Sequence, residues 1–175
     1  MSIETNYIQS IQFQFKDTKR LGTAVLKALT ETELHFKYNE ESSSIATIVA
    51  HISGNMLSRW THFYSEDGEK TWRKRDAEFE ISTASKVEIM DTWETGWNCL
   101  FAIIDDLSPE KLAKDIYIRS EKHTALEAIN RQIFHYSYHV GQLVYIAKMI
   151  QNSTWKPLSI PKNQSDLFNE LKFKK

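Results

Sequence analysis

The sequence predicts an all-α protein built as a four-helix bundle, and three observations lead to this fold class. Only five glycines and three prolines interrupt the 175 residues, which favours long helices over a many-stranded sheet. Four segments of comparable length carry apolar side chains at alternating steps of three and four residues, as on one face of a helix. Two Ser/Thr-x-x-Glu patterns mark helix starts. A bundle is the simplest way for four such faces to bury one another.

The first two helices are expected in the N-terminal third of the chain. The first is predicted from about Glu4 to Leu29, and its apolar face is formed by Ile8, Ile11, Phe15, Thr18, Gly22, Val25 and Leu29. The second begins near the serine cluster 42–44, where a serine side chain can cap the helix, and it runs to about Phe63. Its inward side chains are Ile45, Ile48, Ile52 and Met56.

A long polar connection is predicted over residues 64–82. It has Asp-Gly turn chemistry and no helical period, and it is long for a structureless connection in a compact domain. It is therefore either functional or partly ordered. Two readings apply to its charged groups, which are either solvated or part of a lid that selects an acidic substrate or a thiol: Glu69, Arg73, Arg75 and Asp76. Two tryptophans, Trp60 and Trp72, are either packing residues or pocket walls.

The third and fourth helices each start at a capping box, a Ser or Thr followed three residues later by Glu. The third starts at Ser85 and buries Met90, Trp93, Trp97, Leu100, Ile104 and Leu107. Ser108-Pro109 then predicts a short helical turn, and residues 115–119 alternate as an extended segment does. The fourth starts at Thr124 and buries Leu126, Ile129, Ile133, Tyr136, Val140, Leu143, Ala147 and Ile150.

The whole chain, residues 1–175, is expected to form one domain. Its helical core spans about 4–151, and a tail over 152–175 ends in a short amphipathic helix from about Ser165 to Phe173. A net charge of −1 gives no indication of nucleic acid as a partner. No apolar run is long enough to span a membrane, and no signal peptide is recognisable. With a single cysteine, Cys99, the default location is the cytoplasm.

Two histidines in the fourth helix, His135 and His139, are four residues apart and so lie on one face of the helix. A third, His51, lies in the second helix. The spacing also occurs by chance in many helices, and Tyr136 stands where a zincin metalloprotease has glutamate, which disfavours that class. The remaining histidines fall near segment ends or loops, where solvated side chains are the rule: His35, His62 and His123.

All three histidines flank the apolar faces of their helices. If the second and fourth helices are neighbours, His51, His135 and His139 converge at one end of the bundle. Three neutral imidazoles leave one coordination position open for water or substrate, which is the ligand set of a catalytic metal site. Imidazole ligands suit zinc, nickel, copper or iron, so the sequence does not choose the metal. Candidate partners for the second ring nitrogens are Gln132, Asn55 and Gln142.

Two segments resemble motifs of the DinB/YfiT-like superfamily. They are Ile48-Val-Ala-His51-Ile-Ser-Gly-Asn and His135-x-x-x-His139-x-Gly141-Gln142-Leu143. The resemblance covers about residues 7–150, and the stretches 58–70 and 73–79 are similar to one uncharacterised subgroup. It implies an up-down-down-up four-helix bundle and a three-histidine metal site formed by His51, His135 and His139. It also implies a homodimer.

The resemblance implies a metal-dependent enzyme without settling its reaction. Some members transfer low-molecular-weight thiols such as bacillithiol, mycothiol or glutathione, others are described as metal-dependent hydrolases, and some bind metal with no assigned reaction. We therefore expect a thiol transferase or hydrolase that acts on a small molecule. Its cofactor would be a divalent transition metal, with zinc, nickel, iron and manganese as candidates, and a low-molecular-weight thiol is a second candidate cofactor.

Two readings without catalysis stay open. The bundle is alternatively a metal-binding stress or interaction protein with a structural site, which normally needs a fourth protein ligand, for example Glu69. The other reading is a plain helical dimer without metal.

Overall fold

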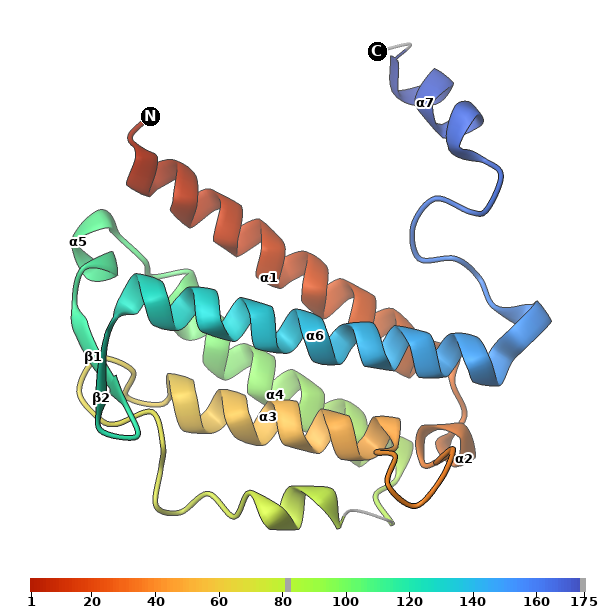
Figure 1. The fold of residues 1–175 in the computed structure, drawn as a ribbon, viewed down its shortest axis with the longest axis horizontal. Coiled ribbons are helices and arrows are strands. Elements are labelled where there is room, and N and C mark those ends of the chain that lie inside the picture. Colours follow the sequence, from red (N-terminus) through yellow and green to blue (C-terminus); the bar gives the residue numbers. More distant parts are fainter. Residues whose placement is uncertain (81–82, 174–175) are drawn as a thin grey trace.

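The structure is a computed structural model, and it describes residues 1–80 and 83–173. Four long helices form a bundle: α1 (Ile3–Ala28), α3 (Ile45–Trp60), α4 (Lys86–Ile104) and α6 (Ala125–Gln151). Figure 1 shows that α1 and α6 run in one direction while α3 and α4 run in the other. The predicted fold class and its up-down-down-up order are therefore confirmed.

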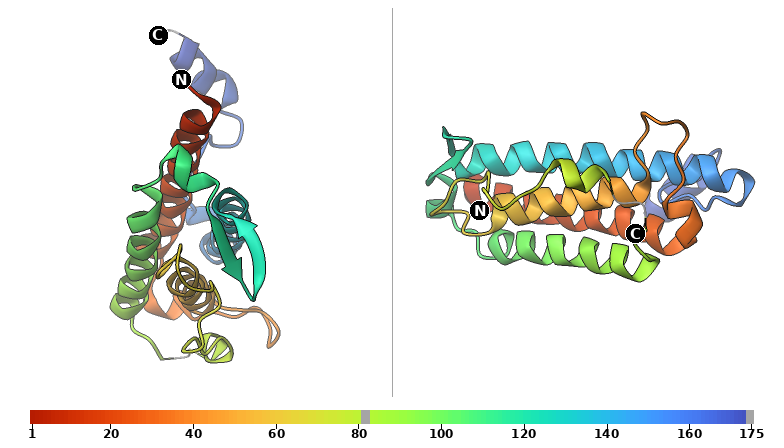
Figure 2. Two further views of the ribbon diagram at one scale, coloured as in Figure 1. Left: turned by 90° about the vertical axis from the view of Figure 1, so that its left-hand side faces the viewer. Right: turned by 90° about the horizontal axis from the view of Figure 1, so that it is seen from below.

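The bundle consists of two closely packed pairs of helices. α3 packs along α4, α1 packs along α6, and α6 also contacts α3 (Figure 2). Because α3 and α4 run in the same direction, the chain must return along the bundle between them. The long predicted connection serves this purpose, and it holds a short 3-10 helix, η1 (Asp76–Phe79), that packs on α3. Of this connection, Ile81 and Ser82 lie outside the described residues.

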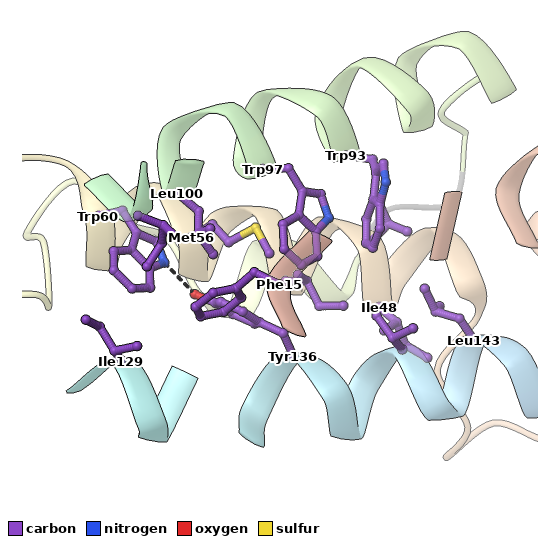
Figure 3. Close-up of a cluster of buried hydrophobic side chains, with 14 of the residues drawn as sticks. Phe15, Ile48, Met56, Trp60, Trp93, Trp97, Leu100, Ile129, Tyr136 and Leu143 are labelled. Carbon is purple, nitrogen blue, oxygen red and sulfur yellow. Dashed lines mark hydrogen bonds between the residues drawn. The ribbon is translucent and has the colours of Figure 1, made fainter. Parts of the chain in front are cut away.

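The core between the helices is rich in aromatic side chains (Figure 3). The Trp60 indole N–H donates to the Tyr136 hydroxyl at 3.0 Å, and that hydroxyl donates to the Asn55 side-chain oxygen at 3.0 Å. This chain satisfies polar groups whose burial without partners would cost about 1–3 kcal/mol each. Trp60 is thus a packing residue, whereas Trp72 is 55% exposed.

Side-chain caps define the starts of the bundle helices. The hydroxyl of Ser44 accepts the Thr47 N–H at the start of α3. Both predicted capping boxes are present, at Ser85 for α4 and at Thr124 for α6. α1 lies one residue from its predicted bounds, and α3 ends at Trp60 rather than near Phe63.

Short elements fill the connections. α2 (Glu31–Leu34) has a capping box of its own and was not predicted, whereas α5 (Pro109–Leu112) starts at the predicted turn. The predicted extended segment is strand β1 (Asp115–Ile118), which pairs antiparallel with β2 (Glu121–Thr124). After η2 (Asn152–Thr154), the predicted C-terminal helix is α7 (Ser165–Phe173), drawn apart from the bundle in Figure 1. No helix in the described residues is long and apolar enough to cross a membrane.

Candidate metal centre

The structure brings together the three histidines singled out from the sequence. His51 from α3 and His135 and His139 from α6 each offer a ring nitrogen, and these three nitrogens lie within 4.8 Å of one another. The Nε2 atoms of His135 and His139 are 3.0 Å apart. The cluster lies midway along α3 and α6 rather than at one end of the bundle, because His51 is near the middle of α3.

The helical period explains how α6 serves the core and the cluster together. Tyr136 and Val140 point into the core and are buried. His135 and His139 each precede one of them by a single residue, so they are turned by about 100° onto the flank that faces α3. Their rings are only partly buried. One helix therefore presents apolar side chains to the interior and imidazoles to a groove.

In two of the three rings, those of His51 and His139, a hydrogen bond fixes which nitrogen carries the proton. His51 Nδ1 donates to Oε2 of Glu78 at 3.0 Å, and His139 Nδ1 donates to Oε1 of Gln142 at 2.8 Å. A carboxylate oxygen and an amide oxygen only accept, so each Nδ1 must hold the hydrogen. Each Nε2 then presents its lone pair. This is the arrangement of a metal-binding histidine held by a polar partner through its other nitrogen.

Glu78 reaches the cluster from η1 in the long connection. Arg73 forms a bidentate ion pair with it, with Nε donating to Oε1 at 2.7 Å and a terminal nitrogen donating to Oε2 at 2.9 Å. Burial acts to raise the pKa of Glu78, but hydrogen bonds from His51 and Arg73 outweigh it and hold that pKa below its usual value. Gly54 leaves the space for Glu78, because a side-chain carbon at position 54 would collide with the carboxylate.

The imidazoles of α6 are in the neutral form that binds metals. Burial, together with the neighbouring His139 and His51, lowers the pKa of His135 to about 3. Burial also lowers the pKa of His139, against the opposing effect of its hydrogen bond with Gln142. Neither ring must lose a proton at neutral pH before it can coordinate a cation.

The donor set fits a divalent transition metal. A tetrahedral zinc ion with about 2.0–2.1 Å bonds to nitrogen holds its ligand atoms about 3.3 Å apart, close to the spacing of His135 and His139. Three protein ligands leave a position open. In the part of the chain that the structure describes, Glu69, the example of a fourth ligand for a structural site, is not in the cluster: it accepts from Arg59 at 2.9 Å and from Arg119 at 3.1 Å.

The other residues considered from the sequence take different positions. Among the candidate partners, Gln142 contacts a histidine, Asn55 accepts from Tyr136, and the buried Gln132 side-chain oxygen has no hydrogen-bond partner in the described residues. In the connection, Arg73 reaches Glu78, while Arg75 stacks on the Phe79 ring and Asp76 is exposed. The remaining histidines, His35, His62 and His123, lie outside the cluster.

The sequence reasoning missed two residues, Glu78 and Gly54. Glu78 is 27 residues from His51, in a stretch without a period that would indicate where its side chains point. The available signal was weak: a carboxylate in an aperiodic connection that is long for a structureless loop.

Two cavities meet at the histidine cluster. One of about 720 Å³ includes His51 and His139 in its lining, and the other, of about 610 Å³, includes His51 and His135. Tyr138 lines both. An open coordination position at the cluster would therefore be accessible to small molecules.

Comparisons with known proteins agree with this architecture. Residues 2–164 match the profile of the family described as "Protein of unknown function (DUF1572)". Among solved structures, the fold is similar to YfiT from Bacillus subtilis, with a TM-score of 0.66 and 14% identity over 86% of this chain and 90% of that chain. YfiT is described as a probable metal-dependent hydrolase with an unusual four-helix bundle topology. The search of curated proteins gave no match. These findings confirm the resemblance to DinB/YfiT-like bundles at the level of the fold.

Proposed function

The chain belongs to the DUF1572 family, and from this premise and the geometry of the histidine cluster we propose that it is a metal-dependent hydrolase of small molecules. His51, His135 and His139 would hold one divalent transition metal. The observation that carries the proposal is the convergence of three ring nitrogens beside open cavities, with Nδ1 of two of the rings already held by a hydrogen bond. The description of YfiT as a probable metal-dependent hydrolase supports the same reaction class.

The residues around the cluster prepare it for this chemistry. A divalent cation bound there would supply Lewis acidity, which makes water or a thiol nucleophilic at neutral pH. Glu78 keeps the proton of His51 on Nδ1, and Arg73 holds Glu78 in place. The Phe79 ring packs on His51 with its centroid 5.2 Å away.

Thiol transfer is the second candidate reaction. It would use the same open position for a low-molecular-weight thiol, and several arginines that line the smaller cavity suit the carboxylates such thiols carry. A non-catalytic metal protein is the third candidate. The absence of a fourth protein ligand in the described residues argues for an open rather than a structural site.

The test is an activity panel on untagged protein, with metal removed and then restored. Amide and ester substrates probe hydrolysis, and glutathione and bacillithiol with electrophilic acceptors probe thiol transfer. We expect turnover that depends on metal and is lost in His139→Ala but kept in His123→Ala. Turnover that persists without metal would contradict the proposal, and metal binding without any turnover would favour the non-catalytic protein.

A homodimer stays a prediction of the family resemblance. The exposed apolar side chains of the described residues are compatible with a second copy, among them Phe13, Phe134 and Tyr145. Light scattering should give a particle twice the mass of one chain, and a particle of 20.5 kDa would contradict the prediction.

A further inference from the structure

The two helices that carry the histidines, α3 and α6, present the same order of side-chain types along the groove between them. On α6, Arg131, His135 and His139 follow one another at intervals of four residues, and Ile146 comes two turns later. On α3, which runs the opposite way, the order is Arg59, Asn55, His51 and then Ile48. The groove is therefore cationic at one end, carries imidazoles in the middle and is apolar at the other end.

The cationic end is the cavity of about 610 Å³. Of the residues that the structure describes, five arginines and no carboxylate line it: Arg59, Arg73, Arg75, Arg119 and Arg131. Among residues 1–80 and 83–173, three carboxylates pair with these five guanidinium groups, which leaves two positive charges in excess there. Arg59 and Arg73 are buried and held in place, and Arg119 is exposed but pairs with Glu69. Arg131 is exposed and pairs with no carboxylate of the described residues.

Arg131 is the arginine best placed to bind a ligand. It lies one helical turn before His135, and among the residues that the structure describes no carboxylate pairs with it. A guanidinium offers five N–H donors in a planar fork that matches the oxygens of a carboxylate or phosphoryl group. Such a group bound by Arg131 would lie beside His135.

The apolar end is the cavity of about 720 Å³ on the other side of the cluster. Its lining is mainly aromatic and aliphatic and includes Phe36, Ile48, Tyr145, Ile146 and Met149. Glu41 contributes a carboxylate to this lining, which disfavours an anion at this end. The two cavities thus have opposite preferences, and His51 and Tyr138 border both.

We propose that the site takes one organic anion that spans both cavities, with its carboxylate or phosphoryl group among the arginines, its apolar group in the aromatic cavity, and its reacting bond between them at the histidines. The proposal rests on the hydrolase function proposed above and names its substrate class. Hydrolysis of an acyl bond there adds the hydroxyl of water to the acyl carbon and gives the remaining proton to the leaving atom. The anionic and apolar halves are then released separately.

The test measures binding by calorimetry, with N-benzoylglycine as the spanning probe. N-Benzoylglycinamide lacks the charge, N-acetylglycine lacks the apolar group, and N-benzoylaminomethylphosphonate replaces the carboxylate by a phosphoryl group. We expect N-benzoylglycine or the phosphonate to bind at least about tenfold more tightly than the uncharged amide, as one charge-assisted contact allows. Whichever anion binds more tightly identifies the head group.

Variants assign the two ends. Arg131→Gln should weaken the binding of N-benzoylglycine about tenfold and leave that of N-benzoylglycinamide unchanged. Tyr145→Ala should weaken the binding of all three benzoyl probes equally and leave that of N-acetylglycine unchanged. Arg20→Gln is the matched control, since Arg20 is an exposed arginine of α1 that pairs with Asp17 and lines neither cavity. Arg131, Tyr145 and Arg20 are exposed, so these variants should fold.

Three results would overturn the proposal. The first is equal binding of the acid and the amide, and the second is no binding of any probe. The third is simultaneous binding of benzamide and N-acetylglycine, each as tight as N-benzoylglycine, which would mean two separate ligands. Titrations on metal-free and zinc-loaded protein separate this proposal from the hydrolase function. Charge selectivity that depends on Arg131 without zinc supports the spanning anion even if no substrate turns over.

Discussion

Tyr136 and its neighbour His135 belong to two regions of the molecule that are built by different rules. Tyr136 is fully buried, and its hydroxyl exchanges hydrogen bonds with Trp60 and Asn55, both from the bundle helix α3. His135 lies in the groove, partly exposed, in a cluster of which one member, His51, is held by Glu78 of the long connection. The core is thus held within the bundle, while the cluster is completed from outside it.

This difference separates stability from function. Burial of large apolar side chains in the core supplies most of the free energy of folding. The cluster instead buries neutral imidazoles and a carboxylate–arginine pair, which stabilise a fold weakly and serve to fix geometry. Damage to the core should therefore lower the free energy of unfolding, whereas damage to the connection should lower the affinity for metal.

The largest effect is expected from Trp97→Ala in the core. Trp97 is fully buried against Phe15, Trp93 and Tyr136, and its indole N–H has no hydrogen-bond partner in the described residues. The variant should lose about 3–5 kcal/mol of unfolding free energy through lost contacts and a cavity. Urea denaturation measures the loss. The metal affinity of the folded fraction should stay near that of wild type. If the metal affinity fell together with the unfolding free energy, the two regions would not be separate.

A smaller effect is expected from Glu78→Gln in the connection. The variant weakens the acceptor that holds His51, so metal affinity should fall about 10–100-fold, as is typical when such a supporting partner is changed. Competition with a chelating dye measures the affinity.

Glu69→Gln is the matched control for this prediction. Glu69 lies in the same connection and also pairs with arginine, but it does not contact the histidines. The metal affinity of the Glu69→Gln variant should equal that of wild type. Equal losses in the two variants would mean that the connection acts through its general order rather than through the hydrogen bond to His51.

The smallest effect is a pH dependence of the metal-free protein. The pKa of His135 is about 3 in the folded state, far below its ordinary value, so between the two values the unfolded chain binds a proton that the folded chain does not. The stabilisation from neutral His135 is therefore complete above its ordinary pKa and is lost as the pH falls. His135→Gln should flatten the fall in melting temperature from about pH 7 to about pH 5, before carboxylates titrate. An identical slope in both proteins would contradict the burial of His135.

Much of the bundle was predictable because its information is local. Apolar spacing placed the four helices, and Ser85 and Thr124 marked two starts through hydrogen bonds three residues away. His135 and His139 were placed on one face by the helical period. His51 was added on the condition that the second and fourth helices are neighbours, which the helical period does not say and the family resemblance implied.

The rest depends on contacts between distant segments. The approach of Glu78 to His51 follows from the path of a connection without periodic sequence, and so does the position of Arg73. The strand β2 was missed because its four residues, of which only Thr124 favours strands, pair through the backbone. The cavity lined by five arginines is formed by residues of α3, of α6, of the turn after β1 and of the long connection. No single segment of the sequence reveals this set.

The central claim is that His51, His135 and His139 together bind one divalent transition metal. A zinc titration of untagged protein, measured by calorimetry, tests it directly. The proteins compared are wild type, the three single alanine variants of these histidines and His123→Ala. We predict one zinc per chain for wild type and His123→Ala, and a sharp loss of affinity in each of the other three. Each of these loses one of three ligands. Equal zinc binding in all five proteins would contradict the account, and the proposed enzyme function would fall with it.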